Sequence, residues 1–140
     1  MGKATVTFNG ESISFGGRTI DILTITGDLI FGSKATVGDR RVREVLEKLI
    51  GKGGYWLLNM QGVGIIDRAA AEFLQDLHFS NYQSRYGFGL VILVSQDCDW
   101  LGQLEGDTED PKSIIEAFDS MVDAKERCRS VLRSMAKDSK

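Results

Sequence analysis

The chain has 140 residues, a mass of 15.5 kDa and a net charge of −3 at pH 7, values typical of one acidic globular domain. This balance argues against binding to nucleic acid or to anionic lipid, because both need a basic surface. No apolar stretch is long enough for direct insertion into a membrane. Cys98 and Cys128 form no paired motif, so we expect reduced thiols and a cytoplasmic location.

The first 17 residues predict an N-terminal β-hairpin. Two alternating stretches, residues 5–8 and 12–15, flank the turn signal Asn9-Gly10. Asn-Gly between such stretches favours a tight hairpin turn. Because an exposed strand edge can pair with a copy of itself, the hairpin also makes a homodimer one hypothesis.

The main domain is expected over residues 18–136, followed by a frayed tail at residues 137–140. Its first strand covers residues 19–26, which are rich in β-branched side chains. The glycine and aspartate at Gly27-Asp28 are expected to end this strand.

An amphipathic helix follows this strand. Its apolar residues recur at helical spacing and are Val42, Val45, Leu46, Leu49 and Ile50. Ser33 or Thr36 would cap the start of the helix, and Gly51 would end it.

A second strand and a second helix meet near Asp67. Residues 55–60 are almost continuously apolar, which suits a central strand covered on both faces. Residues 61–66 contain two glycines and predict a loop. Asp67 is the expected N-cap of a helix that runs to about Arg85, because its carboxylate can accept hydrogen bonds from the first turn. The core-facing stripe of this helix comprises Ala71, Leu74, Leu77, His78 and Asn81.

Three further elements and a final helix complete the domain. Residues 90–94 predict an apolar strand, residues 97–104 a short helix and residues 114–118 the last strand. Ser120 would cap the final helix. The apolar face of that helix comprises Met121, Ala124, Cys128, Val131, Leu132 and Met135. Its solvated face carries Arg127, Arg129 and Arg133.

The alternation of strands and helices predicts a single α/β domain. We expect a mixed sheet of four to five strands with helices mainly on one face, plus the N-terminal β-hairpin. Ligands of such sheets gather at the carboxyl ends of the strands. The loop before Asp67 and the start of the second helix occupy such a place, which makes them the first candidate site.

Signals for chemistry are weak in this sequence. Gly62-x-Gly64 lacks the lysine and the hydroxyl residue of a phosphate loop, so a tight turn is the better interpretation. His78 is the only histidine, and no cluster of metal ligands or spacing of nucleophile and base accompanies it. We therefore expect no metal, no cofactor and no enzymatic activity. The acidic residues between positions 97 and 110 fit a solvated loop.

Several of these segments together resemble the STAS domain of bacterial anti-sigma factor antagonists. A strand ends in a Gly-Asp turn at residues 23–29, and residues 58–60 (Leu-Asn-Met) are similar to the family's Leu-Asp/Asn-Leu strand. Residues 65–70 (Ile-Ile-Asp-Arg-Ala-Ala) stand where the family has a hydrophobic pair and then Asp-Ser-Ser-Gly. Residues 115–124 resemble its closing strand and helix. The likeness covers about residues 18–135 and rests on the order and spacing of the motifs.

The resemblance implies a switch that this chain lacks. In the phosphorylatable members of the family, a partner kinase that is also the anti-sigma factor phosphorylates the second serine of the motif, and the phosphate blocks binding. Here Arg68, Ala69 and Ala70 replace Ser-Ser-Gly, and only Asp67 is kept. Alanine has no hydroxyl, so we expect no phosphoregulation at Ala69.

What the resemblance implies is a non-catalytic regulatory module that binds a protein, either an anti-sigma factor or a related kinase-like regulator. The expected contact surface comprises Asp67, Arg68 and Ala69 at its centre, with Gly64, Ile65, Ser33 and Lys34 around them. Two other functions stay open. One is a scaffold or transporter-associated STAS subunit, and the other is a module that binds a small anion, a nucleotide or a lipid at the loop before the second helix.

Overall fold

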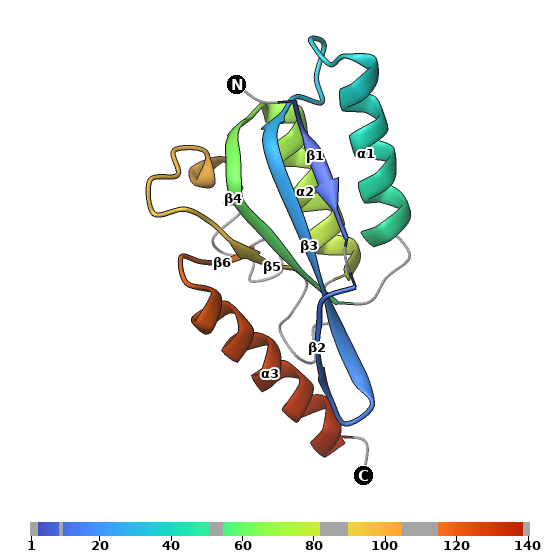
Figure 1. The fold of residues 1–140 in the computed structure, drawn as a ribbon, viewed down its shortest axis with the longest axis vertical. Helices are drawn as coiled ribbons and strands as arrows, with labels where there is room; N and C mark the ends of the chain where they lie inside the picture. The colour runs from blue at the N-terminus through green and yellow to red at the C-terminus, as the bar shows by residue number, and fades with distance from the viewer. Residues whose placement is uncertain (1–2, 9, 51–54, 82–89, 105–114, 139–140) are drawn as a thin grey trace.

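The computed structural model describes residues 3–8, 10–50, 55–81, 90–104 and 115–138. They form a mixed β-sheet with helices on both faces (Figure 1). This arrangement confirms the α/β fold that the alternation of strands and helices predicts.

Six strands make up the sheet. They are β1 (Thr5–Thr7), β2 (Ser12–Phe15), β3 (Arg18–Leu29), β4 (Trp56–Ile66), β5 (Leu90–Leu93) and β6 (Glu116–Phe118). Strands β3 to β6 are parallel neighbours in that order, while β1 and β2 both pair antiparallel with β3. The carboxyl ends of four parallel strands therefore lie along one edge of the sheet, which is the edge where ligands of such sheets gather.

Two of the three α-helices cover one face of the sheet, and the third covers the other. The helices are α1 (Val37–Ile50), α2 (Arg68–Asn81), the short 3₁₀ helix η1 (Leu101–Leu104) and α3 (Met121–Asp138). Leu58 belongs to the core beneath α1, α2 and η1, whereas its neighbour Leu57 belongs to the core beneath α3. Successive residues of a strand point to opposite faces, so one apolar strand fills both cores.

The N-terminal hairpin forms, but between different strands from those predicted. Within the described residues, β2 turns into β3 through Gly16 and Gly17, whose φ angles are 61° and 79°. β1 pairs further along β3 rather than with β2. Two consecutive residues with positive φ are what a type I′ turn requires, and glycine adopts them without strain. The Gly-Gly pair therefore sets the hairpin, while Asn9 of the predicted turn lies outside the described residues.

Two segments predicted to leave the sheet remain part of it. β3 continues through Gly27 and Asp28, and residues 61–66, predicted as a loop, form the second half of β4. The loop prediction was wrong because close packing between the strands requires glycine there. A Cβ on Gly62 would lie 2.7 Å from Cγ2 of Thr26 on the neighbouring strand. Glycine in a strand can mark such a close approach as well as a turn.

The start of α1 matches the predicted cap at Thr36. The Thr36 hydroxyl accepts a hydrogen bond from the N–H of Asp39 at 3.1 Å, and the Asp39 carboxylate accepts one from the N–H of Thr36 at 2.9 Å. This reciprocal pair is a capping box. In the predicted stripe Leu46 and Ile50 are fully buried, whereas Val45 is exposed.

The apolar face of α3 is also confirmed. Its buried residues are Ala124, Cys128, Val131, Leu132 and Met135, and Met121 is half-buried. Arg127, however, does not lie on a solvated face as predicted. Its Nε donates to both carboxylate oxygens of Glu116 at 2.9 and 3.1 Å, which joins α3 to β6. The predicted features at Gly51, Arg85 and Ile114 lie outside the described residues.

Candidate functional site

Asp67 lies between the end of β4 and the first turn of α2. Its Oδ1 accepts a hydrogen bond from the N–H of Ala70 at 2.8 Å, and its main-chain oxygen accepts one from the N–H of Ala71 at 3.0 Å. The side chain therefore caps the helix, as predicted. The stripe predicted to face the core is buried and comprises Ala71, Leu74, Leu77, His78 and Asn81.

The same carboxylate binds a loop that is distant in the sequence. Its Oδ2 accepts hydrogen bonds from the N–H groups of Phe31 and Gly32, 36 and 35 positions away, at 3.1 and 2.8 Å. In the other direction, the N–H of Asp67 donates to the main-chain oxygen of Leu29 at 3.0 Å. Asp67 thus fixes the loop between β3 and α1 against the start of α2. Sequence reasoning found the cap and missed this second role.

An open hollow of about 530 Å³ lies between this loop and α2. Its lining comprises Ile30, Gly32, Ser33, Lys34, Asp67, Arg68, Ala69 and Glu72. Five of the seven predicted site residues are therefore brought together from two segments far apart in the chain. A Cβ on Gly32 would lie 3.0 Å from Oδ2 of Asp67 and 3.7 Å from Cβ of Ala69. Glycine therefore allows the loop to approach the helix this closely.

Gly64 and Ile65, the other two predicted residues, lie outside this hollow at the end of β4. The N–H of Ile65 donates to Oδ1 of Asp28 at 3.2 Å, and a Cβ on Gly64 would lie 2.6 Å from the same oxygen. Asp28 lines an adjoining hollow of about 500 Å³, which shares Ile30 with the first. The two hollows and the exposed side chain of Ile65 thus belong to one end of the molecule.

The charged groups at this end differ in their solvent exposure. The Arg68 side chain is 91% exposed and pairs with Glu72 at 3.2 Å. Lys34 is also exposed, and no described carboxylate forms an ion pair with it. Asp28 and Asp67, in contrast, are half-buried and bonded to main-chain N–H groups. A cation in the first turn of a helix is opposed by the helix dipole, so the position of Arg68 is an unfavourable one for the stability of α2.

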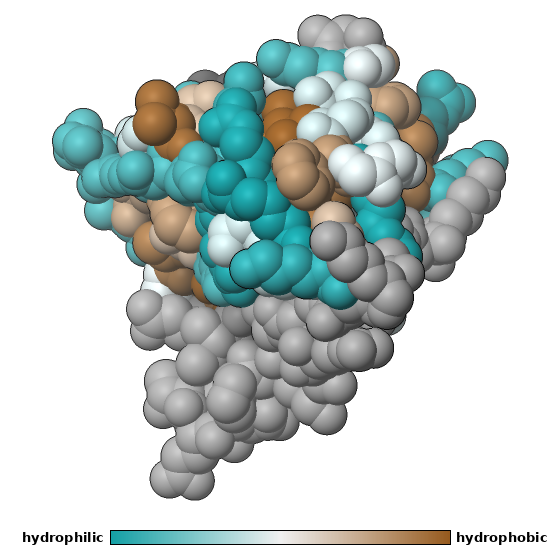
Figure 2. Space-filling model, turned by 90° about the horizontal axis from the view of Figure 1, so that it is seen from below, coloured by the Kyte–Doolittle hydropathy of each residue, from teal (hydrophilic) through white to brown (hydrophobic). Residues whose placement is uncertain are grey.

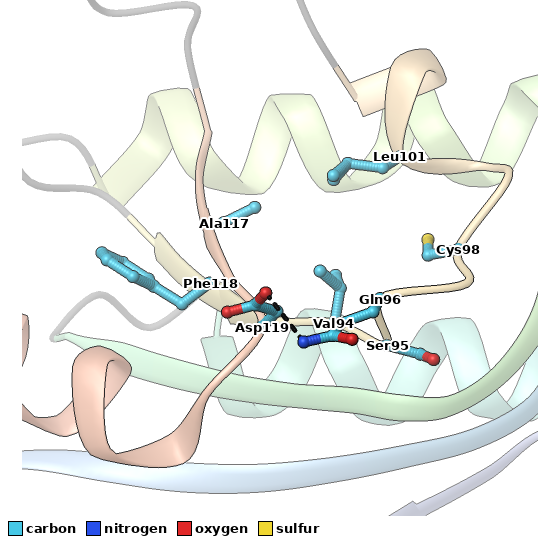
Figure 3. A pocket seen from close by; sticks show the side chains of 8 residues that line it. All are labelled: Val94, Ser95, Gln96, Cys98, Leu101, Ala117, Phe118 and Asp119. Atoms are coloured by element: carbon cyan, nitrogen blue, oxygen red, sulfur yellow. Dashed lines mark hydrogen bonds between the residues drawn. The ribbon is translucent and has the colours of Figure 1, made fainter.

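A second region at the carboxyl edge is also hollow. It encloses about 620 Å³ at the ends of β5 and β6 (Figure 3). Val94, Leu101 and Ala117 point into it, and the side-chain amide of Gln96 donates to the carboxylate of Asp119 at 3.3 Å. No sequence pattern predicted this hollow, because its residues come from two segments that meet only when β5 and β6 pair.

The two cysteines lie in different surroundings, and both are free thiols. Cys98 lines the hollow at β5 and β6. Desolvation raises the pKa of its thiol, hydrogen bonds from the backbone of Leu101 and Trp100 oppose the rise, and the charge of Asp99 adds to it. In α3, burial raises the pKa of Cys128 to about 12. Since the thiolate is the reactive form, neither cysteine is a strong nucleophile at neutral pH.

His78 belongs to the core rather than to a site. Its side chain is buried, and its Nδ1 accepts a hydrogen bond from the N–H of Leu90 at 3.0 Å, which fastens α2 to β5. Among the described residues, no group of three or more histidine, cysteine, aspartate or glutamate side chains is arranged to hold a metal ion. No helix in the described part of the chain combines the length and the apolar character needed to cross a membrane.

No family model, no curated protein and no solved structure matches this chain.

Proposed function

We propose that this chain is a non-catalytic regulatory module that binds a protein partner with the surface formed by the β3–α1 loop and the start of α2. By its resemblance to anti-sigma factor antagonists, the partner is an anti-sigma factor or a related kinase-like regulator. The observation that carries the proposal is the carboxylate of Asp67, which holds both segments in one surface. A cytoplasmic location belongs to the proposal and is supported by the two free thiols.

Ala69 supports the second part of the proposal, which concerns regulation. It lines the hollow between the loop and α2, at the position where the resembling family carries its phosphorylated serine. A methyl group cannot accept a phosphoryl group, so phosphorylation at this position cannot release the partner. The module would then act by competition for the surface of the partner.

Charge reversal at Arg68 tests the binding surface. Arg68 is exposed and contributes little to the fold, so Arg68→Glu should weaken binding to a kinase-like anti-sigma factor of the same organism by about tenfold or more. Isothermal titration calorimetry gives the affinities. Arg133→Glu is the matched control, because Arg133 is an exposed, ion-paired arginine on the other face, in α3. Unchanged affinity for Arg68→Glu contradicts the proposal.

A restored hydroxyl at position 69 tests the regulatory part. The wild-type protein should take up no phosphate at this position from the partner kinase and ATP. Ala69→Ser should be phosphorylated on the introduced hydroxyl and should then bind the kinase more weakly. Mass spectrometry locates the phosphate. If Ala69→Ser is not phosphorylated, the resemblance to the phosphorylatable members loses its support.

A further inference from the structure

We propose that the partner contacts this end of the molecule through an acidic segment that also presents a hydrophobic side chain. The inference rests on the proposed function and adds the chemistry of the partner. It follows from the way in which charges and aliphatic side chains are distributed at the carboxyl ends of β3 and β4.

The carboxylates of this end are directed toward the main chain of the protein itself. Asp28, Asp39 and Asp67 are half-buried, and each accepts hydrogen bonds from backbone N–H groups. Glu72 is exposed but is paired with Arg68. Carboxylates that are already engaged in this way are poorly placed to attract a basic partner.

The cations of the same end lie on the outside. Lys3, Lys34, Arg40 and Arg41 are exposed, and none of them forms an ion pair with a described residue. Arg68 is the most exposed partner of any ion pair in the described part of the chain. Both α1 and α2 begin at this end, and helix N-termini carry a partial positive charge. The outer layer is therefore positive, although the chain as a whole has a charge of −3.

Two aliphatic side chains stand among these cations. Val37 is 64% exposed and Ile65 is 54% exposed. Val37 lines the same hollow as Lys3 and Ile30. The phosphates of a nucleic acid would pair with the cations but would leave these side chains in water. A protein segment that carries both carboxylates and an apolar side chain satisfies both features.

The other hollow at the carboxyl edge of the sheet carries a different charge. Among the described residues, no lysine or arginine lines the hollow at β5 and β6, and Asp97, Asp99 and Asp119 are exposed in its neighbourhood. Seen from below, the opposite end of the molecule shows hydrophobic side chains in small patches between hydrophilic ones (Figure 2). An acidic segment would therefore be guided toward the end where α1 and α2 begin.

Site-specific photocrosslinking tests the inference. The full chain is expressed in its source organism with p-benzoylphenylalanine in place of Val37 or Ile65. Val122, which is 74% exposed on α3, is the control position. Both test positions should capture the same protein through a segment with more aspartate and glutamate than lysine and arginine. Combining Lys34→Glu with Arg68→Glu should lower the yield about tenfold or more, whereas Lys125→Glu on α3 should not.

The outcomes separate this inference from the proposed function. A captured protein segment that is neutral or basic overturns the inference and leaves the proposed function standing. Capture from Val122 alone, or from no position, overturns both. Capture of nucleic acid, of lipid or of a second copy of this chain at Val37 and Ile65 also overturns both. A synthetic peptide with the sequence of an acidic captured segment should bind this protein, as measured by fluorescence anisotropy. The same peptide with its aspartates changed to asparagine and its glutamates changed to glutamine should bind more weakly.

Discussion

The hollow beside Asp67 and the hollow at β5 and β6 both lie along the carboxyl edge of the sheet, but they use their acidic side chains in opposite ways. At the end of β3 and β4, the carboxylate of Asp67 is half-buried and accepts hydrogen bonds from the main chain of three residues. At the end of β5 and β6, the carboxylate of Asp119 is exposed and accepts a hydrogen bond from the side chain of Gln96. The first carboxylate joins two segments of the chain, whereas the second remains available to solvent. A place at the sheet edge does not by itself decide which role an acid has.

Removal of each carboxylate should give the largest contrast. Asp67→Ala leaves the N–H groups of Phe31, Gly32 and Ala70 without their acceptor, and we expect it to lower the free energy of unfolding by about 2–4 kcal/mol. Asp119→Ala should change it by no more than about 0.5 kcal/mol. Urea unfolding followed by circular dichroism measures both. Equal losses in the two variants would show that Asp67 acts only as an exposed acid does.

Only part of the role of Asp67 could be predicted from the sequence. A cap depends on residues within one helical turn, so the pattern around Asp67 and Ala70 was sufficient to predict it. The bonds to Phe31 and Gly32 depend on how β3 and β4 pair, which a local pattern does not contain. For the same reason the sequence placed Ser33 and Lys34 beside Ala69 only through a family resemblance.

Crowding between strands gives the second contrast. Gly62→Ala places a Cβ 2.7 Å from Cγ2 of Thr26, whose β-branched side chain is stiff, and we expect a loss of about 1–3 kcal/mol in the free energy of unfolding. Gly102→Ala in η1, beside the other hollow, meets nothing within 4 Å and should be neutral or slightly stabilising. Thermal and urea unfolding of the two variants provide the comparison.

A double-mutant cycle identifies the cause of the loss at Gly62. Thr26→Ser removes Cγ2, so Gly62→Ala should cost less in the Thr26→Ser background than in the wild type. Strictly additive effects would mean that the loss does not come from contact with this methyl group.

Thiol reactivity measures the electrostatic difference between the hollows. Ala69→Cys, made in a Cys98→Ser background, places a thiol at a helix N-terminus near Lys34 and Arg68, where the thiolate is favoured. Cys98 has a raised pKa because of desolvation. At pH 7.5 we expect the Ala69→Cys thiol to react with Ellman's reagent about tenfold faster than Cys98, and both rates should rise with pH.

Cys128 provides an internal reference in the same experiment. Its pKa of about 12 and its burial should keep it unreactive until the protein unfolds. If Cys98 reacts as fast as the Ala69→Cys thiol, the two hollows do not differ in potential as their charged residues indicate.

Truncation of the exposed cations should have the smallest effect on stability. Arg68→Ala and Lys34→Ala should each change the free energy of unfolding by less than about 0.5 kcal/mol, because ion pairs in solvent contribute little. Urea unfolding again provides the measurement. A large loss would mean that these side chains serve the fold, and their place in a binding surface would then need another argument.

The fold itself was predictable where a segment carries a single strong signal. The buried strand β5 (Leu90–Leu93) follows from a continuous apolar run, and the apolar face of α3 follows from its helical spacing. The segments with competing signals were not predictable in the same way. Asn9-Gly10 and Gly16-Gly17 both favour hairpin turns, and among the described strands only β2 and β3, on either side of Gly16-Gly17, form such a pair of consecutive strands joined by a tight turn. The glycines of residues 61–66 predict a loop locally, while the side chains of the neighbouring strand require them inside β4.

The hydrogen bonds from Phe31 and Gly32 to Asp67 also affect how a partner would bind, in both affinity and rate. Fixing the backbone of one flexible residue costs roughly 1–2 kcal/mol in conformational entropy. Here that ordering takes place when the chain folds, before any partner arrives. A protein partner of the kind proposed above would meet a loop and a helix end that already have their final relative positions, so binding should retain more of its contact energy. Association should then approach the rates of rigid docking, on the order of 10⁵ to 10⁷ M⁻¹ s⁻¹.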